Sequence, residues 1–201
     1  MKRSILLLLL LFPAFLFAQN SYTRGYDENT DESKKLMYNY TYGSYLFSGS
    51  GNYIMGISSV SYFSNGRQQF GLGAGVSSQK INSDSGRVNF VSVPVYLANK
   101  YYLTQNATNG GLYMDIHAGF NLPVSAIFES GEKSGQPVDP ANIRSTGMYG
   151  IAFGWRFTGK KEFRQLNYIV EIAYRKQQVP VDPDTKKHSS DFMGINLGLS
   201  F

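Results

Sequence analysis

The most regular alternation of apolar and polar residues occupies the segment 191–201. One parity carries Met193, Ile195, Leu197, Leu199 and Phe201, and the other carries only glycine, asparagine and serine from Gly194 onward. Because successive side chains of a strand point to opposite faces, the segment predicts a strand with one apolar face and one small polar face. A closed barrel in an outer membrane has no free edge and directs apolar side chains at lipid, so the pattern favours that fold over an open sheet.

The same period of two recurs along the chain and predicts eight strands. Turn-forming residues separate them, and the clearest hairpin signal is Asn65-Gly66. Each strand is near the roughly 9–11 residues that a tilted strand needs to cross a bilayer. The fold class predicted is all-β, an eight-stranded antiparallel up-and-down transmembrane β-barrel. The strands are expected at about 36–47, 53–63, 68–79, 88–103, 111–123, 146–158, 165–178 and 191–201.

Proline interrupts one of these segments. Pro94 lies inside the fourth strand, whose alternation places Val91, Val93, Val95 and Leu97 on one face. Proline has no N–H to donate to a neighbouring strand, so we expect a bulge or a local kink at this position.

The amino-terminal residues have the pattern of a secretory signal peptide. Lys2 and Arg3 precede an apolar run that ends at Phe17, and cleavage is expected between Ala18 and Gln19. The run is too short for a comfortable membrane helix, although an uncleaved anchor is the alternative. The domain plan is therefore a signal peptide at 1–18, a flexible polar leader at 19–35 and an outer-membrane β-barrel at 36–201.

Composition narrows the functional classes. The chain has 19 basic and 14 acidic side chains, a net charge of +5, and the basic residues are scattered, so nucleic acid is not an expected partner. The absence of cysteine excludes disulfides and thiolate metal sites. Aromatic residues make up 15% of the chain, and Trp155 and the tyrosines suit the aromatic belts of a membrane protein.

Several segments together resemble a known family. They are Gly71-Leu-Gly-Ala-Gly75, Phe90-Val-Ser-Val-Pro-Val-Tyr96, Gly154-Trp-Arg-Phe157 and Gly194-Ile-Asn-Leu-Gly-Leu-Ser-Phe201. They are similar to small outer-membrane β-barrel domain proteins, the "porin family" of Gram-negative bacteria, over nearly the whole mature chain. The resemblance implies location in the cell outer membrane, and insertion by the barrel-assembly machinery with Phe201 as the insertion signal. It supplies no catalytic residues.

Charged residues on the non-apolar parity are expected inside the barrel. If the apolar parities face lipid, the inward residues include Asp115, His117, Arg156, Glu171 and Arg175. Buried charges should pair, because an isolated buried charge is costly. We therefore expect the two carboxylates to pair with Arg156 and Arg175 and to fill a lumen that, with eight strands, leaves little room for a pore.

The sequence leaves the biochemical role open. The favoured role is structural or surface-interactive, for a monomer that contacts outer-membrane lipid and reaches an envelope partner through the loops 129–145 and 179–190. A small-molecule pore or ligand-binding barrel is the alternative, and a hydrolase using His117, or His188 with Ser189, Ser190 and Asp191, comes third. We expect no enzyme activity and no cofactor. Calcium bound by Asp139, Asp182 and Asp184 is a weak possibility, because Asp-Pro turns are common.

A secreted soluble barrel of the lipocalin kind is the rival fold. It also has eight alternating strands, but its apolar side chains face inward and its charged ones face water. The non-apolar faces of this chain carry mostly glycine, serine and asparagine and few lysines, which argues against it.

Overall fold

A computed structural model describes residues 37–65, 67–83, 86–104, 110–131, 134–138, 144–157, 167–178 and 189–200. The signal peptide 1–18 with its cleavage site at Ala18 and Gln19, the leader 19–35, His188 and Phe201 lie outside these ranges, so the interpretations placed on them stay predictions. Within the described ranges there is no helix with the length and apolar character needed to cross a membrane.

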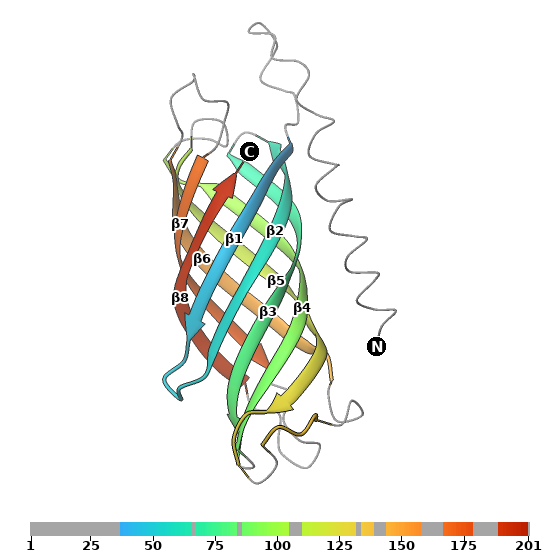
Figure 1. Cartoon of the computed structure of the whole chain (residues 1–201). Helices are drawn as coiled ribbons and strands as arrows, with labels where there is room; N and C mark the ends of the chain where they lie inside the picture. The colour runs from blue at the N-terminus through green and yellow to red at the C-terminus, as the bar shows by residue number, and fades with distance from the viewer. Residues whose placement is uncertain are drawn as a thin grey trace, which may run out of the picture. The chain divides into compact units, whose positions relative to one another are not determined.

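The strands form one closed barrel in which each is antiparallel to the next and β1 also pairs with β8 (Figure 1). This confirms the predicted eight-stranded up-and-down barrel. The strands are β1 (Met37–Phe47), β2 (Tyr53–Asn65), β3 (Gln68–Ser83), β4 (Gly86–Tyr102), β5 (Gly111–Phe128), β6 (Thr146–Phe157), β7 (Asn167–Gln178) and β8 (Ser189–Ser200).

The register around the barrel fixes its width. Successive partners lead from Ser200 once around the barrel and return to β8 at Ser190, a stagger of 10 residues (200 − 190). A barrel of this kind has strands tilted by roughly 35–45° and an interior just wide enough to be filled by side chains. The path passes through Tyr40, Val60, Gly73, Tyr96, Gly119, Met148 and Gln177.

The irregularity expected at Pro94 is placed differently in the structure. On the β3 side, pairing is absent opposite Pro94 and continues beyond it in the same register, as a residue without an N–H requires. The register shift instead lies between Val91 and Ser92, on the β5 side. There Val91 faces Ser125 and Ser92 faces Pro123, so Val124 is the extra residue of a β-bulge. The expected irregularity at Pro94 is thus an interruption of pairing with β3, whereas the bulge itself lies beside Val91 and Ser92.

The bulge also explains why β5 is longer than predicted. Before it, even-numbered residues face outward, and Val124 is 48% exposed. After it the parity reverses, so Ala126 is buried and Ile127 is exposed. A search for one unbroken alternation ends the strand near residue 123, whereas β5 continues to Phe128.

We call the end of the barrel where β1 begins and β8 ends the proximal end, and the opposite end the distal end. At the distal end β3, β4 and β5 extend beyond their neighbours around a small apolar cluster of Ile81, Val88, Phe90 and Ala126. The chain after β5 covers the edge of this extension. Phe128 N donates to Gln136 O at 3.0 Å, and Val138 N donates to Ala126 O at 2.9 Å.

Candidate functional site

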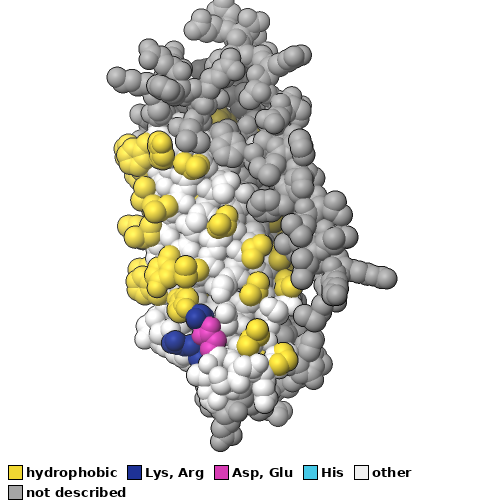
Figure 2. All heavy atoms as spheres, viewed as in Figure 1, with side chains coloured by type: hydrophobic (Ala, Val, Ile, Leu, Met, Phe, Trp, Pro, Cys, Tyr) yellow, Lys and Arg dark blue, Asp and Glu magenta, His cyan; other side chains and the backbone are white. Residues whose placement is uncertain are grey.

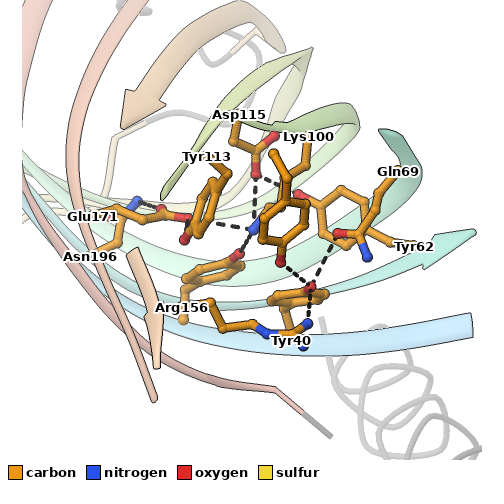
Figure 3. A network of polar contacts seen from close by, with 11 residues as sticks. Tyr40, Tyr62, Gln69, Lys100, Tyr113, Asp115, Arg156, Glu171 and Asn196 are labelled. Carbon is orange, nitrogen blue, oxygen red and sulfur yellow. Dashed lines mark hydrogen bonds and ion pairs between the residues drawn. The ribbon is translucent and has the colours of Figure 1, made fainter. Parts of the chain in front are cut away.

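The interior of the barrel contains a buried lysine that sequence analysis did not single out. Lys100 lies on the inward parity of β4 and its side chain is fully buried. Its Nζ lies 3.6 Å from Asp115 Oδ2 of β5 and 3.7 Å from Glu171 Oε1 of β7. Figure 3 shows the ammonium between the two carboxylates, so that one cation neutralises acids from two different strands.

Tyrosine rings surround the same ammonium. The Nζ of Lys100 lies 4.0 Å from the ring centroid of Tyr113, 4.1 Å from that of Tyr40 and 5.0 Å from that of Tyr62. It also donates a hydrogen bond of 2.5 Å to Tyr42 Oη. Aromatic faces attract cations more strongly when both are desolvated, so these rings partly replace the water that Lys100 loses.

The carboxylates are held by further hydrogen bonds. Tyr62 Oη donates to Asp115 Oδ2 at 2.5 Å, and Tyr113 Oη donates to Glu171 Oε1 at 2.7 Å. Asn196 of β8 donates through Nδ2 to Glu171 Oε2 at 2.8 Å. Each of these bonds joins side chains of two different strands, so the acids and their donors hold one another in place.

A second cation closes the proximal side of this group. Arg156 of β6 donates from Nη1 to Tyr40 Oη at 3.0 Å, and the same hydroxyl lies 3.0 Å from Tyr102 Oη. Tyr40 in turn donates to Gln69 Oε1 at 3.1 Å. We call these connected residues the tyrosine plug: Tyr40, Tyr42, Tyr62, Gln69, Lys100, Tyr102, Tyr113, Asp115, Arg156, Glu171 and Asn196 (Figure 3).

The five residues expected in the lumen are all buried, but their pairing differs from the expectation. Asp115, His117, Arg156, Glu171 and Arg175 are each at most 8% exposed. The ion pairs of both carboxylates are formed with Lys100, not with the two arginines. The arginines lie apart from each other along the barrel, because Arg156 is near the proximal end of β6 and Arg175 is toward the distal end of β7.

The tyrosines divide between the two faces of the wall. Tyr45, Tyr149 and Tyr168 have the outward position that the expected interfacial belts require, and they are 51%, 55% and 59% exposed. The expectation is wrong for the tyrosines of the plug, which point inward. Parity along the strands would have separated the two groups, because Tyr40 and Tyr42 share the even parity of β1 whereas Tyr45 does not.

Catalytic and metal-binding arrangements were sought in the same interior. His117 packs against Tyr96 with ring centroids 5.6 Å apart, and its buried Nε2 forms no hydrogen bond with the described residues. Among the residues that the structure describes, no three His, Cys, Asp or Glu side chains lie close enough to hold a metal ion. Asp139, Asp182 and Asp184 lie outside the described ranges.

The outer wall of the barrel is apolar. Figure 2 shows hydrophobic side chains over the visible wall, with the visible charged side chains gathered near its lower end. The central band is mainly aliphatic, and between the two aromatic belts no outward-facing side chain of the described strands is charged. The central residues include Ile57, Leu72, Leu97, Ile116, Ile172, Ile195 and Leu197. The proximal belt includes Phe63, Phe70, Tyr101, Trp155, Phe157 and Tyr168, and the distal one Tyr45, Phe47, Phe120 and Tyr149.

The chain was compared with protein families, curated sequences and solved structures, and a similarity appears in the last of these. No protein-family model and no curated protein sequence matches the chain. Among solved structures, the chain is similar to Neisserial surface protein A, with a TM-score of 0.46 and 11% sequence identity. The alignment covers 82% of this chain and 94% of that one. The fold described above comes from the strand pairing of the chain itself.

Proposed function

We propose that this chain is a small outer-membrane β-barrel with a structural or surface-interaction role and a lumen closed by side chains. The observation that carries the proposal is the apolar outer wall, uncharged between its two aromatic belts, of a barrel that has no free edge. Soluble monomers rarely expose continuous apolar patches of more than a few hundred Å². A lipid bilayer is the environment in which such a wall is stable, and outer-membrane lipid is therefore the first partner.

The polarity of the barrel supports lipid rather than water around it. Ionisable side chains such as Lys100 and Glu171 are inside, while Ile172 and Leu197 are 66% and 59% exposed. A soluble ligand-binding barrel of the lipocalin kind has the opposite arrangement. Aromatic side chains at both rims and aliphatic ones between them are typical of a protein that crosses a bilayer.

The interior supports a structural role rather than transport or catalysis. The tyrosine plug contains side chains from all eight strands, near the proximal end of the barrel. Its Lys100, Tyr40 and Tyr62 are fully buried. A histidine whose Nε2 has no hydrogen-bond partner among the described residues lacks the base-to-nucleophile contact of a hydrolase. We therefore propose no enzyme activity and no cofactor.

Surface interaction is proposed at the distal end. The extension of β3, β4 and β5 forms a rigid base there, and Lys80 Nζ pairs with Glu129 Oε1 at 2.7 Å across it. Loops on a rigid scaffold are common sites of recognition, so the connections 129–145 and 179–190 are the proposed contacts for an envelope partner. Insertion by the barrel-assembly machinery and a monomeric state are part of the same proposal.

The test is heat-modifiability after refolding into detergent micelles. A closed membrane barrel is expected to migrate faster on a gel when unboiled than when boiled, and its strands are expected to resist protease. The refolded protein should precipitate when detergent is removed, because its apolar wall is then exposed to water. A protein that stays monomeric and soluble without detergent would sink the outer-membrane proposal and favour a soluble barrel.

A further inference from the structure

A second group of inward side chains lies on the distal side of the tyrosine plug. It comprises His117 and Asn121 of β5, Thr146 of β6, and Arg175 and Gln177 of β7. Each contributes at least one buried polar atom that forms no hydrogen bond with the described residues: His117 Nε2, Asn121 Oδ1 and Nδ2, Thr146 Oγ1, Arg175 Nε and Gln177 Oε1. Buried polar atoms are nearly always satisfied, so this concentration on three adjacent strands requires an explanation.

The register places these side chains at two levels, with Asn121 and Thr146 four residues beyond His117 and Gly150 on the same strands (121 − 117 and 150 − 146). Asn121 is directly opposite Thr146, and Gly150 of β6 is opposite both His117 and Arg175. A Cβ at Gly150 would lie 2.5 Å from His117 Nε2, so the imidazole occupies the space over the glycine. His117 and Arg175 therefore converge across a position that has no side chain.

Arg175 is a buried cation without a carboxylate. It is 7% exposed and forms no ion pair within the described ranges. The interior carboxylates Asp115 and Glu171 are bound by Lys100 on the proximal side. Removing a charge from water without a partner costs several kcal/mol even after relaxation, so a counter-ion near Arg175 would be strongly favoured.

Arg175 and two rings near it are not completely covered by protein atoms. His117 and Arg175 are 8% and 7% exposed, and Tyr96, which touches His117, is 7% exposed. Arg175 is therefore less completely enclosed than Gln177 and Lys100, which are 1% and 0% exposed.

We propose that the barrel interior holds a small monovalent inorganic anion of halide size, bound by the guanidinium of Arg175. The guanidinium N–H groups donate to an anion and supply the opposite charge, and a halide needs about the same room as a buried water molecule. Asp115 faces the same interior two residues from His117, but its Oδ2 is engaged by Tyr62 and Lys100. The inference does not depend on the location of the protein in a membrane.

The experiment measures urea unfolding of the detergent-refolded protein in sodium bromide and in sodium methanesulfonate of equal ionic strength. An ion that binds only the folded state shifts the folding equilibrium in proportion to its concentration once that exceeds Kd. We expect about a tenfold shift for each tenfold rise in bromide above Kd, and a much smaller shift with the bulkier methanesulfonate. Equal shifts in both salts would overturn the proposal, since water alone would then satisfy these atoms.

Two variants separate the site from general salt effects. Arg175→Met should abolish the bromide dependence, because the cation is lost. The matched control is Lys176→Met, which removes the next charge on β7, in a pair with Asp191 on the outer face; it should keep the dependence. If Arg175→Met does not fold, crystals of the wild-type protein grown with bromide are expected to show an anomalous peak beside Arg175. The absence of that peak would count against the site, and a peak only at the protein surface would mean an adventitious ion only.

Discussion

At the scale of single residues, Lys100 is the position on which the barrel interior most depends. It contacts two carboxylates and four tyrosines, and these come from strands β1, β2, β5 and β7. A buried ion pair is not in itself strongly stabilising, because desolvation offsets much of the attraction. Removing one partner is different, since the remaining charges stay buried.

Replacement of Lys100 by methionine is therefore expected to destabilise the protein by about 3–5 kcal/mol, because Asp115 and Glu171 would be left without their cation. Urea unfolding in detergent would measure the change. The exposed control Lys176→Met should change the free energy of unfolding by less than about 1 kcal/mol.

The same argument predicts a rescue. In the triple variant Lys100→Met, Asp115→Asn and Glu171→Gln, no charge remains buried at this level, so much of the lost stability should return. A triple variant as unstable as Lys100→Met would mean that the lysine acts through packing and the tyrosine rings, and not by neutralising the carboxylates.

Sequence alone could have placed Lys100 inside but not its partners. The alternation of β4 puts Val95 and Leu97 outward, which puts Lys100 on the inward parity. Which carboxylate meets which cation depends on the stagger of 10 residues around the barrel, seen in the return from Ser200 to Ser190. That stagger is set by the pairing of all strands, and no local pattern encodes it.

At the scale of elements, the strand bounds predicted from the sequence agree well with the observed ones where one parity is continuously apolar. The predicted ranges of β1 and β6 differ from the observed strands by one residue at one end. The prediction fails where a backbone irregularity reverses the parity, as at Val124 in β5, because a period of two cannot be followed across an inserted residue. Because β7 alternates regularly, substitutions on its outward face can test whether that face contacts lipid.

A charge placed on the outer face of β7 should have a cost that depends on depth. Ile172 is 66% exposed in the central band, and Gln178 is exposed at the distal end of the same strand. In a bilayer, Ile172→Lys should cost about 2–4 kcal/mol and Gln178→Lys about 0–1 kcal/mol. Urea unfolding of both variants in lipid vesicles gives the comparison.

The two environments predict effects of different size for Ile172→Lys. On the surface of a soluble protein, a lysine at a position as exposed as Ile172 would change stability by only about 0.5 kcal/mol in either direction. Equal, small effects at both positions would therefore contradict contact between the central band and hydrocarbon.

At the scale of the whole molecule, the tyrosine plug and the polar group around Arg175 fill successive levels of one narrow barrel. An eight-stranded barrel leaves room for little more than its own inward side chains. The molecule should consequently behave as a closed body and not as a pore.

Liposomes containing the refolded protein are expected not to swell in solutions of a small sugar. The double variant Tyr40→Ala and Tyr102→Ala removes two hydrogen-bonded rings from the proximal side of the plug, and it should increase the leak of small ions. Its heat-dependent shift on a gel would show that it still folds. Sugar permeation through the wild-type protein would instead favour the small-molecule pore.

The seam between β1 and β8 has a consequence for the order of events in folding. Tyr40 pairs with Ser200, a partner 160 residues away (200 − 40), so the cylinder cannot close until the final segment has been made and delivered. Contacts of such long range form slowly. Until then β1 and β7 both present unpaired edges that another chain could join, and a chain cut short before β8 keeps those edges permanently. Once the last strand has paired with β1 and β7, no free edge remains to which another chain could add a strand.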